Sequence, residues 1–218
     1  MDDSKWERWG ALGGILFAVC VAITVILPGE PPGISDPAGD VVKFIVDKSD
    51  ELRWSAYLSG VATIFLFWWL GSLWRLMRRL EGGSPRLAVA ALAGGVFASL
   101  FGAIGSIMLG ALPIIGVKTI GAGGTRAFYV VATCLGFAAL FGVAVLVGSA
   151  SILFIRTRTN ALLGWFGVVV AVVSILGGYA VASSRDEVMT LGFIGFIGAL
   201  LWVLILSILM LRQAPEAA

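Results

Sequence analysis

The chain has 218 residues, of which 59% are hydrophobic and 13% charged, and its mean hydropathy is +1.01. A soluble domain of this size could not cover so much apolar surface, so the composition excludes an ordinary water-soluble fold. The formal net charge of +2 is too small to indicate nucleic-acid binding, and the absence of histidine removes the commonest metal ligand and general base.

Six apolar stretches without a charged residue dominate the sequence, at 9–27, 54–74, 87–112, 127–155, 161–182 and 188–211. Each is long enough to cross a hydrocarbon layer of about 30 Å as an α-helix, which needs about 20 residues. Backbone groups in lipid must pair within their own segment, and the ten-residue alternation of a β-barrel is missing. The sequence therefore predicts an all-α, polytopic transmembrane bundle of about six spans, forming a single membrane domain over residues 1–218.

The first stretch has an alternative interpretation as a signal peptide, because Lys5 and Arg8 precede it. It lacks a clear small-x-small cleavage site and is longer than a typical signal-peptide core, which favours a retained helix. Cleavage would leave five spans and an external N-terminus.

The connection over residues 28–53 is predicted to contain a short external helix. Asp36 followed by Pro37 is typical of an N-cap and first helical position. The apolar and charged positions that follow separate into two faces, which predicts an amphipathic helix on the bundle or in the headgroup region. The apolar face has Val41, Val42, Ile45 and Val46, and the polar face has Lys43, Asp47 and Lys48. We interpret it as a packed lid, with a partner-binding helix as the alternative.

Small residues recur along three of the predicted spans, and the fourth span has Ala132, Gly136, Ala144 and Gly148 in one register. The third span has one at every fourth position: Ala90, Gly94, Ala98, Gly102, Ser106 and Gly110. The sixth span has Gly192, Gly195 and Gly198. Because helices in lipid associate through close packing, such residues let a neighbouring backbone approach. We expect them to pack helices within the chain, with homodimerisation as the alternative.

The end of the third span contains a proline, and a glycine-rich segment follows it. Pro113 should end or kink the helix. Gly121, Gly123 and Gly124 then predict a flexible loop before Arg126.

Basic residues are distributed unequally between the two sides that six spans would create. One side has nine: Lys5, Arg8, Arg75, Arg78, Arg79, Arg86, Arg156, Arg158 and Arg212. The other side has six: Lys43, Lys48, Arg53, Lys118, Arg126 and Arg185. Cytoplasmic loops carry an excess of lysine and arginine, so we expect both termini in the cytoplasm.

The first half of the chain resembles multi-helix integral membrane proteins of high-GC Gram-positive bacteria that form a domain of unknown function. The resemblance is carried by the sequence Trp9-Gly10-Ala11-Leu12-Gly13-Gly14-Ile15-Leu16-Phe17, and by the helix start Ser35-Asp36-Pro37-Ala38 before a second span that ends in arginines. It implies a bacterial plasma membrane and no active site.

The spans contain no ionisable Asp, Glu, Lys or Arg, which disfavours proton-coupled carriers and retinal proteins. Cys20 and Cys134 are interpreted as buried hydrophobic residues. We predict no catalytic, cofactor-binding or metal-binding residues and no cofactor, and membrane lipid, a second copy or another membrane subunit as partners.

The leading hypothesis is a non-enzymatic structural or accessory membrane component. The first alternative is a channel or carrier for a small neutral or lipophilic solute, favoured by a hydrated cavity at the membrane midplane. A lipid-modifying enzyme is the second, and requires polar groups that converge near Pro113 and Asp186.

Overall fold

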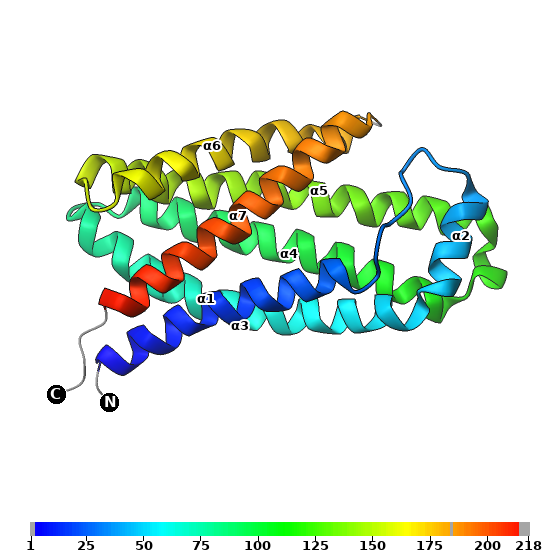
Figure 1. Cartoon of the computed structure of the whole chain (residues 1–218), viewed down its shortest axis with the longest axis horizontal. Helices are drawn as coiled ribbons and strands as arrows, with labels where there is room; N and C mark the ends of the chain where they lie inside the picture. Colours follow the sequence, from blue (N-terminus) through cyan, green and yellow to red (C-terminus); the bar gives the residue numbers. More distant parts are fainter. Residues whose placement is uncertain (1–2, 184, 214–218) are drawn as a thin grey trace.

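The computed structural model describes residues 3–183 and 185–213, with side chains over 8–183, 185 and 187–212. This part of the chain is all-α, and its helices are α1 (Asp3–Ile26), α2 (Ala38–Asp47), α3 (Ser49–Glu81), α4 (Arg86–Ile115), α5 (Val117–Thr157), α6 (Ala161–Gly178), the short 3-10 helix η1 (Tyr179–Ala182) and α7 (Asp186–Gln213). Six of them are long and apolar enough to cross a membrane, and α2 lies between the first two (Figure 1). The predicted fold class is confirmed.

The six long helices form a closed ring in chain order. Each packs against the next one along the chain, and α7 returns to pack against α1. Short connections make successive helices antiparallel, so both ends of the described chain lie at the same end of the bundle (Figure 1). We call this the arginine-rich end, for the charges described below, and the opposite one the α2 end.

Large side chains fill the interior between α3, α5 and α7. Trp69, Phe154 and Trp202 are each at most 2% exposed. The rings of Trp69 and Trp202 meet edge to face with centroids 6.4 Å apart, and Phe154 stacks on Trp202 at 6.3 Å. Such aromatic pairs add to the packing energy beyond their buried area. This core continues through Met77 and Ala88 toward the arginine-rich end.

A second, smaller core lies under α2. Val41 and Ile45 are fully buried and pack with Leu52, Leu112 and Tyr129 from the three helices below. The predicted amphipathic helix on the bundle is therefore confirmed.

The predicted N-cap of this helix is wrong. Pro37 occupies the N-cap position and makes no side-chain capping bond. The Asp36 carboxylate instead accepts a hydrogen bond from the backbone N–H of Gly33 at 2.8 Å, because the chain turns there before the helix begins.

The connection between α4 and α5 also differs from the prediction. The helix α4 continues through Pro113 and ends two residues later, at Ile115. Helix α5 then begins at Val117, and only Gly121 leaves the helical conformation, with φ 68° and ψ 171°. The predicted flexible loop is wrong because two glycines with positive φ, Gly116 between the helices and Gly121 within α5, turn the chain without a longer connection.

Candidate functional site

Helices α4 and α5 touch where two glycines meet. A Cβ atom built on Gly94 would lie 2.6 Å from the backbone nitrogen of Leu146 and 2.7 Å from the carbonyl oxygen of Gly142. A Cβ atom built on Gly142 would in turn lie 2.6 Å from the carbonyl oxygen of Gly94. The two backbones are therefore in direct contact, and neither position has space for a side chain.

The other small residues of α4 do not face α5 alone. A methyl group on Gly102 would have no atom of another helix within 4 Å, whereas a methyl group on Gly110 would meet Ala56 of α3 at 2.4 Å. Ser106 donates a hydrogen bond to the carbonyl oxygen of Ser55, also on α3. A four-residue repeat advances about 40° beyond one full helical turn at each step, so the row winds around the helix from α5 to α3. Ala90 and Ala98, also members of this row, are both half-buried.

The glycines of α7 lie against α6. A Cβ atom on Gly177 would come within 2.3 Å of the Cα atom of Gly192, so the two helices touch there through backbone. Gly195 lies against Ser174, and a Cβ atom on Gly198 would lie 2.9 Å from the side chain of Val170. Gly195 and Gly198 thus face α6, whereas Gly192 lies between α6 and α5, where a Cβ atom would come within 2.7 Å of the Phe137 ring.

Helix α1 is held against two partners through its own glycines. The carbonyl oxygen of Phe65 on α3 would lie 2.9 Å from a Cβ atom on Gly13. A Cβ atom on Gly14 would meet both Trp69 of α3 and Ser207 of α7. The glycines within the Trp9 to Phe17 segment therefore join α1 to the bundle.

Sequence reasoning missed Gly142 and Gly177, although each lies at a tight helix contact. Gly142 follows Ala138 at the four-residue spacing of small residues, a pattern too common in membrane helices to single it out. Its role comes from Gly94 on the neighbouring helix, and the sequence does not tell which faces of the two helices meet.

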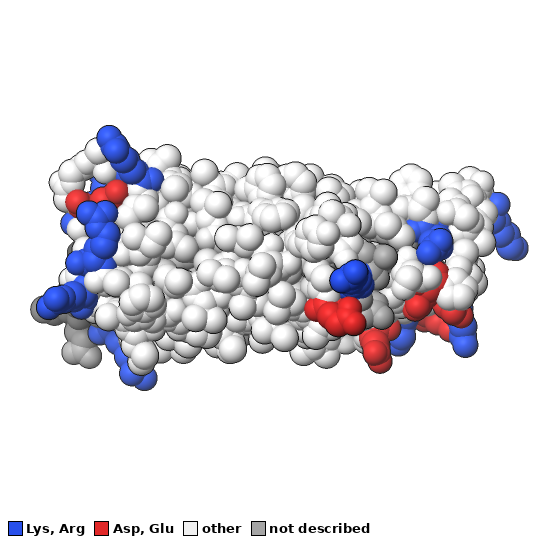
Figure 2. Space-filling view, turned by 90° about the horizontal axis from the view of Figure 1, so that it is seen from above, with Lys and Arg blue, Asp and Glu red and all other residues white. Residues whose placement is uncertain are grey.

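Charged side chains gather at the two ends of the molecule. Between them lies a surface without charged side chains, white in Figure 2, which we call the central belt. The arginine-rich end has one described carboxylate, Glu81, and eight arginines: Arg8, Arg75, Arg78, Arg79, Arg86, Arg156, Arg158 and Arg212. Both acidic and basic residues occur at the α2 end. The sequence assigns Lys5 to the arginine-rich end, but its side chain lies outside the described residues.

The single described carboxylate at the arginine-rich end has a structural role. The two oxygens of Glu81 accept hydrogen bonds from the backbone N–H groups of Leu87 and Ala88, at 2.9 and 3.1 Å. These are N–H groups of the first turn of α4, which have no partner within the helix. Glu81 therefore caps α4 from the preceding helix, and its charge matches the positive end of the helix dipole.

The central belt exposes apolar side chains, with aromatic rings at its edges. On α3 the uncharged stretch between Arg53 and Arg75 spans about 33 Å, close to the thickness of a bilayer core. Five tryptophan and tyrosine side chains at the edges of the belt are more than half exposed: Trp9 and Trp165 toward the arginine-rich end, and Trp54, Tyr57 and Tyr179 toward the α2 end. Such rings are typical of the two membrane–water interfaces.

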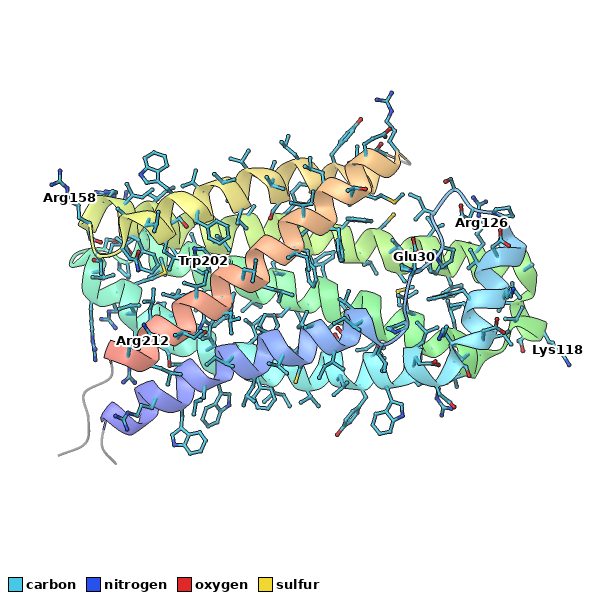
Figure 3. All side chains as sticks on the ribbon, viewed as in Figure 1. Glu30, Lys118, Arg126, Arg158, Trp202 and Arg212 are labelled. Carbon is cyan, nitrogen blue, oxygen red and sulfur yellow. The ribbon has the colours of Figure 1, made fainter. Side chains whose placement is uncertain are left out.

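Two side chains of α5 hold the connection between α1 and α2 at the α2 end. Arg126 donates a hydrogen bond to the carbonyl oxygen of Ile34 at 3.1 Å, and the hydroxyl of Tyr129 donates to the carbonyl oxygen of Pro32. Figure 3 shows Arg126 beside this segment, above α2. The proline-rich segment is thus fixed across the end of the bundle.

Few groups capable of chemistry come together in this part of the chain. Cys20 and Cys134 are free thiols, and both are half-buried rather than buried as predicted, because they lie on helix faces near the surface of the bundle. Over the described residues, no three His, Cys, Asp or Glu side chains converge into a metal site. The Asp186 side chain, named above for a lipid-modifying enzyme, lies outside the described residues.

No protein family model, curated protein or solved structure matches the chain. The resemblance of its first half to multi-helix proteins of Gram-positive bacteria thus has no identified family behind it. Helix length and hydropathy establish a multi-pass membrane protein with six candidate spans.

Proposed function

We propose that the chain is a non-enzymatic structural or accessory component of a bacterial plasma membrane, with the arginine-rich end in the cytoplasm. The orientation is supported by the eight arginines at that end, where Glu81 is the one carboxylate among the described side chains, compared with the mixed charges at the α2 end. Short basic loops remain on the cytoplasmic side during insertion.

The packing of the interior is the observation that carries the structural role. Trp69, Phe154 and Trp202 fill the space between α3, α5 and α7, and the indole N–H of Trp202 donates to the carbonyl oxygen of Leu163 at 3.2 Å. Around them, direct backbone contacts at the glycines join α4 to α5 and α6 to α7. A path for a solute would have to separate helices that these contacts hold together, at the cost of many van der Waals contacts.

Two measurements on the protein in lipid test this proposal. Vesicles containing the purified chain should release glycerol and urea no faster than empty vesicles of the same lipid. The protein extracted in native lipid discs should have a protein mass above that of the 22.9 kDa chain, owing to a second copy or another membrane subunit. Solute flux above the empty-vesicle rate would replace the proposal with the channel or carrier, and a solitary chain in every disc would remove the accessory role.

A further inference from the structure

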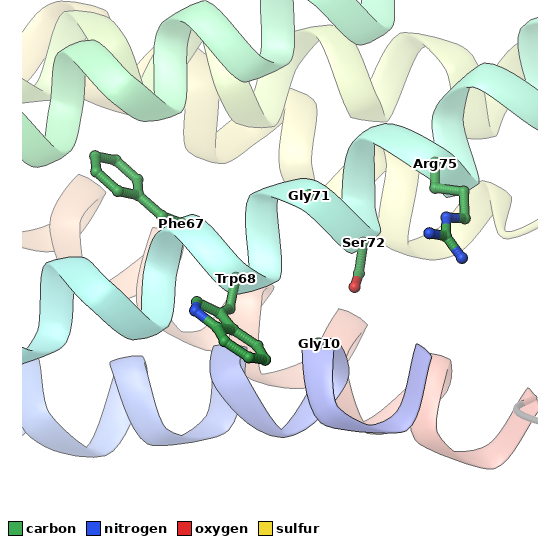
Figure 4. Close-up of a pocket in the computed structure, with 6 residues that line it drawn as sticks. All are labelled: Gly10, Phe67, Trp68, Gly71, Ser72 and Arg75. Atoms are coloured by element: carbon green, nitrogen blue, oxygen red, sulfur yellow. The ribbon is translucent and has the colours of Figure 1, made fainter. Parts of the chain in front are cut away.

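A groove of about 300 Å³ runs between α1 and α3 toward the arginine-rich end. Its lining is Gly10 from α1, with Phe67, Trp68, Gly71, Ser72 and Arg75 from α3 (Figure 4). The α3 residues recur at four-residue intervals and so share one face of that helix. In Figure 4, Trp68 and Ser72 point toward α1, and Arg75 lies further along α3.

Glycine creates the open space in the groove. A Cβ atom on Gly71 would meet nothing within 4 Å, in contrast to the tight glycines at the helix contacts. Glycine within a helix is unfavourable relative to alanine, and here no close helix contact explains it. The missing side chain leaves a hollow on the outer surface of α3, between Trp68 and Arg75.

The chemistry of the groove changes along its length. Phe67 and Trp68 provide exposed apolar and aromatic surface in the belt. Arg75 lies eight residues beyond Phe67, about 12 Å toward the arginine-rich end. A guanidinium group binds phosphate oxygens through several N–H donors. The Ser72 side chain instead packs against Gly10 and closes the groove on the side of α1. This order, apolar in the belt and cationic at its edge, matches a phospholipid.

The charge at this end selects the headgroup. Arg75 belongs to the group of eight arginines that faces a single described carboxylate, which attracts anionic rather than zwitterionic lipid. Arg75 also has an interaction within the chain, and since a guanidinium carries five N–H donors, only one or two of them need to reach the phosphate.

We propose that the groove between α1 and α3 binds one anionic phospholipid, with its phosphate at Arg75 and an acyl chain along Trp68 and Gly71. It is a defined binding position within the membrane, in addition to the general attraction of the basic end for the lipid surface.

Native mass spectrometry tests the proposal on the full chain, reconstituted in equal amounts of phosphatidylglycerol and phosphatidylcholine and then released in mild detergent. The wild type should retain one phosphatidylglycerol in preference to phosphatidylcholine. Gly71→Leu fills the groove and Arg75→Gln removes the charge. Each should lower this retention by about fivefold or more, as expected for the loss of a shaped contact or a charge-assisted hydrogen bond.

Matched variants separate the groove from general effects. Gly60→Leu changes another glycine of α3 that has nothing within 4 Å, and Arg158→Gln removes a charge from the same end but from the turn after α5. Both should retain phosphatidylglycerol like the wild type. Unchanged retention in Gly71→Leu, equal loss in Arg158→Gln, or no preference of the wild type for the anionic lipid would overturn the proposal. This experiment measures lipid retention, whereas the proposed function is tested by solute flux and by the protein mass in lipid discs. A negative result for lipid binding is therefore distinct from a negative result for the proposed function.

Discussion

The contact between α4 and α5 leads to a quantitative prediction for two glycines of the same helix, Gly94 and Gly102. A methyl group on Gly94 would lie 2.6 Å from the backbone of Leu146, whereas a methyl group on Gly102 meets nothing within 4 Å. Ordinary contacts begin at 3.4 Å, so Gly94→Ala must separate the helices by about 0.8 Å. Overpacking of this kind costs about 1–3 kcal/mol.

The pair of alanine variants cancels the effect of helix propensity. Both replacements exchange glycine for alanine inside α4, and each gains up to about 1 kcal/mol from the better helix former. The difference between the two variants therefore reports packing alone. We expect Gly102→Ala to be more stable than Gly94→Ala by about 1–3 kcal/mol, in the free energy of unfolding measured by SDS titration in mixed micelles. Equal stability of the two variants would refute the assignment of Gly94 to a backbone contact.

Three further outcomes follow from the described contacts. Trp202→Ala should lower the free energy of unfolding by about 3–5 kcal/mol, because it empties a fully buried site; a change below about 1 kcal/mol in the same titration would contradict a packed interior. Glu81→Ala should speed amide hydrogen exchange at Leu87 and Ala88, whose N–H groups it leaves without their acceptor, and unchanged exchange there would argue against the cap. Tyr129→Phe removes the hydrogen bond to Pro32, so limited proteolysis should cut residues 28–37 faster than in the wild type; an unchanged rate would show that this bond does not hold the segment.

The sequence predicts the spans well because their cause is local. A stretch such as 54–74 has no charge over a length that matches the bilayer core, and this property requires no knowledge of its neighbours. The external helix is equally local, since Val41 and Ile45 mark its buried face through their spacing. The positions of these elements were therefore predictable without the structure.

Contacts between helices were less predictable, because they depend on two segments at once. The row of small residues on α4 is visible in the sequence. Because the row winds around the helix, Gly94 contacts α5 whereas Gly110 contacts α3. Gly142 acquires its role only through Gly94. In the same way, the position of Asp36 in the sequence suits a helix cap. The chain turns before the helix, however, and the Asp36 carboxylate accepts a hydrogen bond from the backbone N–H of Gly33 instead.

The central claim is that the uncharged belt lies in lipid and the arginine-rich end in the cytoplasm, and cysteine labelling tests it most directly. Three single-cysteine variants are made in a background where Cys20 and Cys134 are replaced by alanine. Lys43→Cys places the thiol at the α2 end, and Ser84→Cys places it in the turn between α3 and α4. Ile104→Cys places it in the belt, where Ile104 is 47% exposed. A membrane-impermeant maleimide should label only Lys43→Cys in intact cells, reach Ser84→Cys after the membrane is opened, and leave Ile104→Cys unlabelled in both. Labelling of Ile104→Cys in the intact membrane, or of Ser84→Cys before opening, would contradict the account.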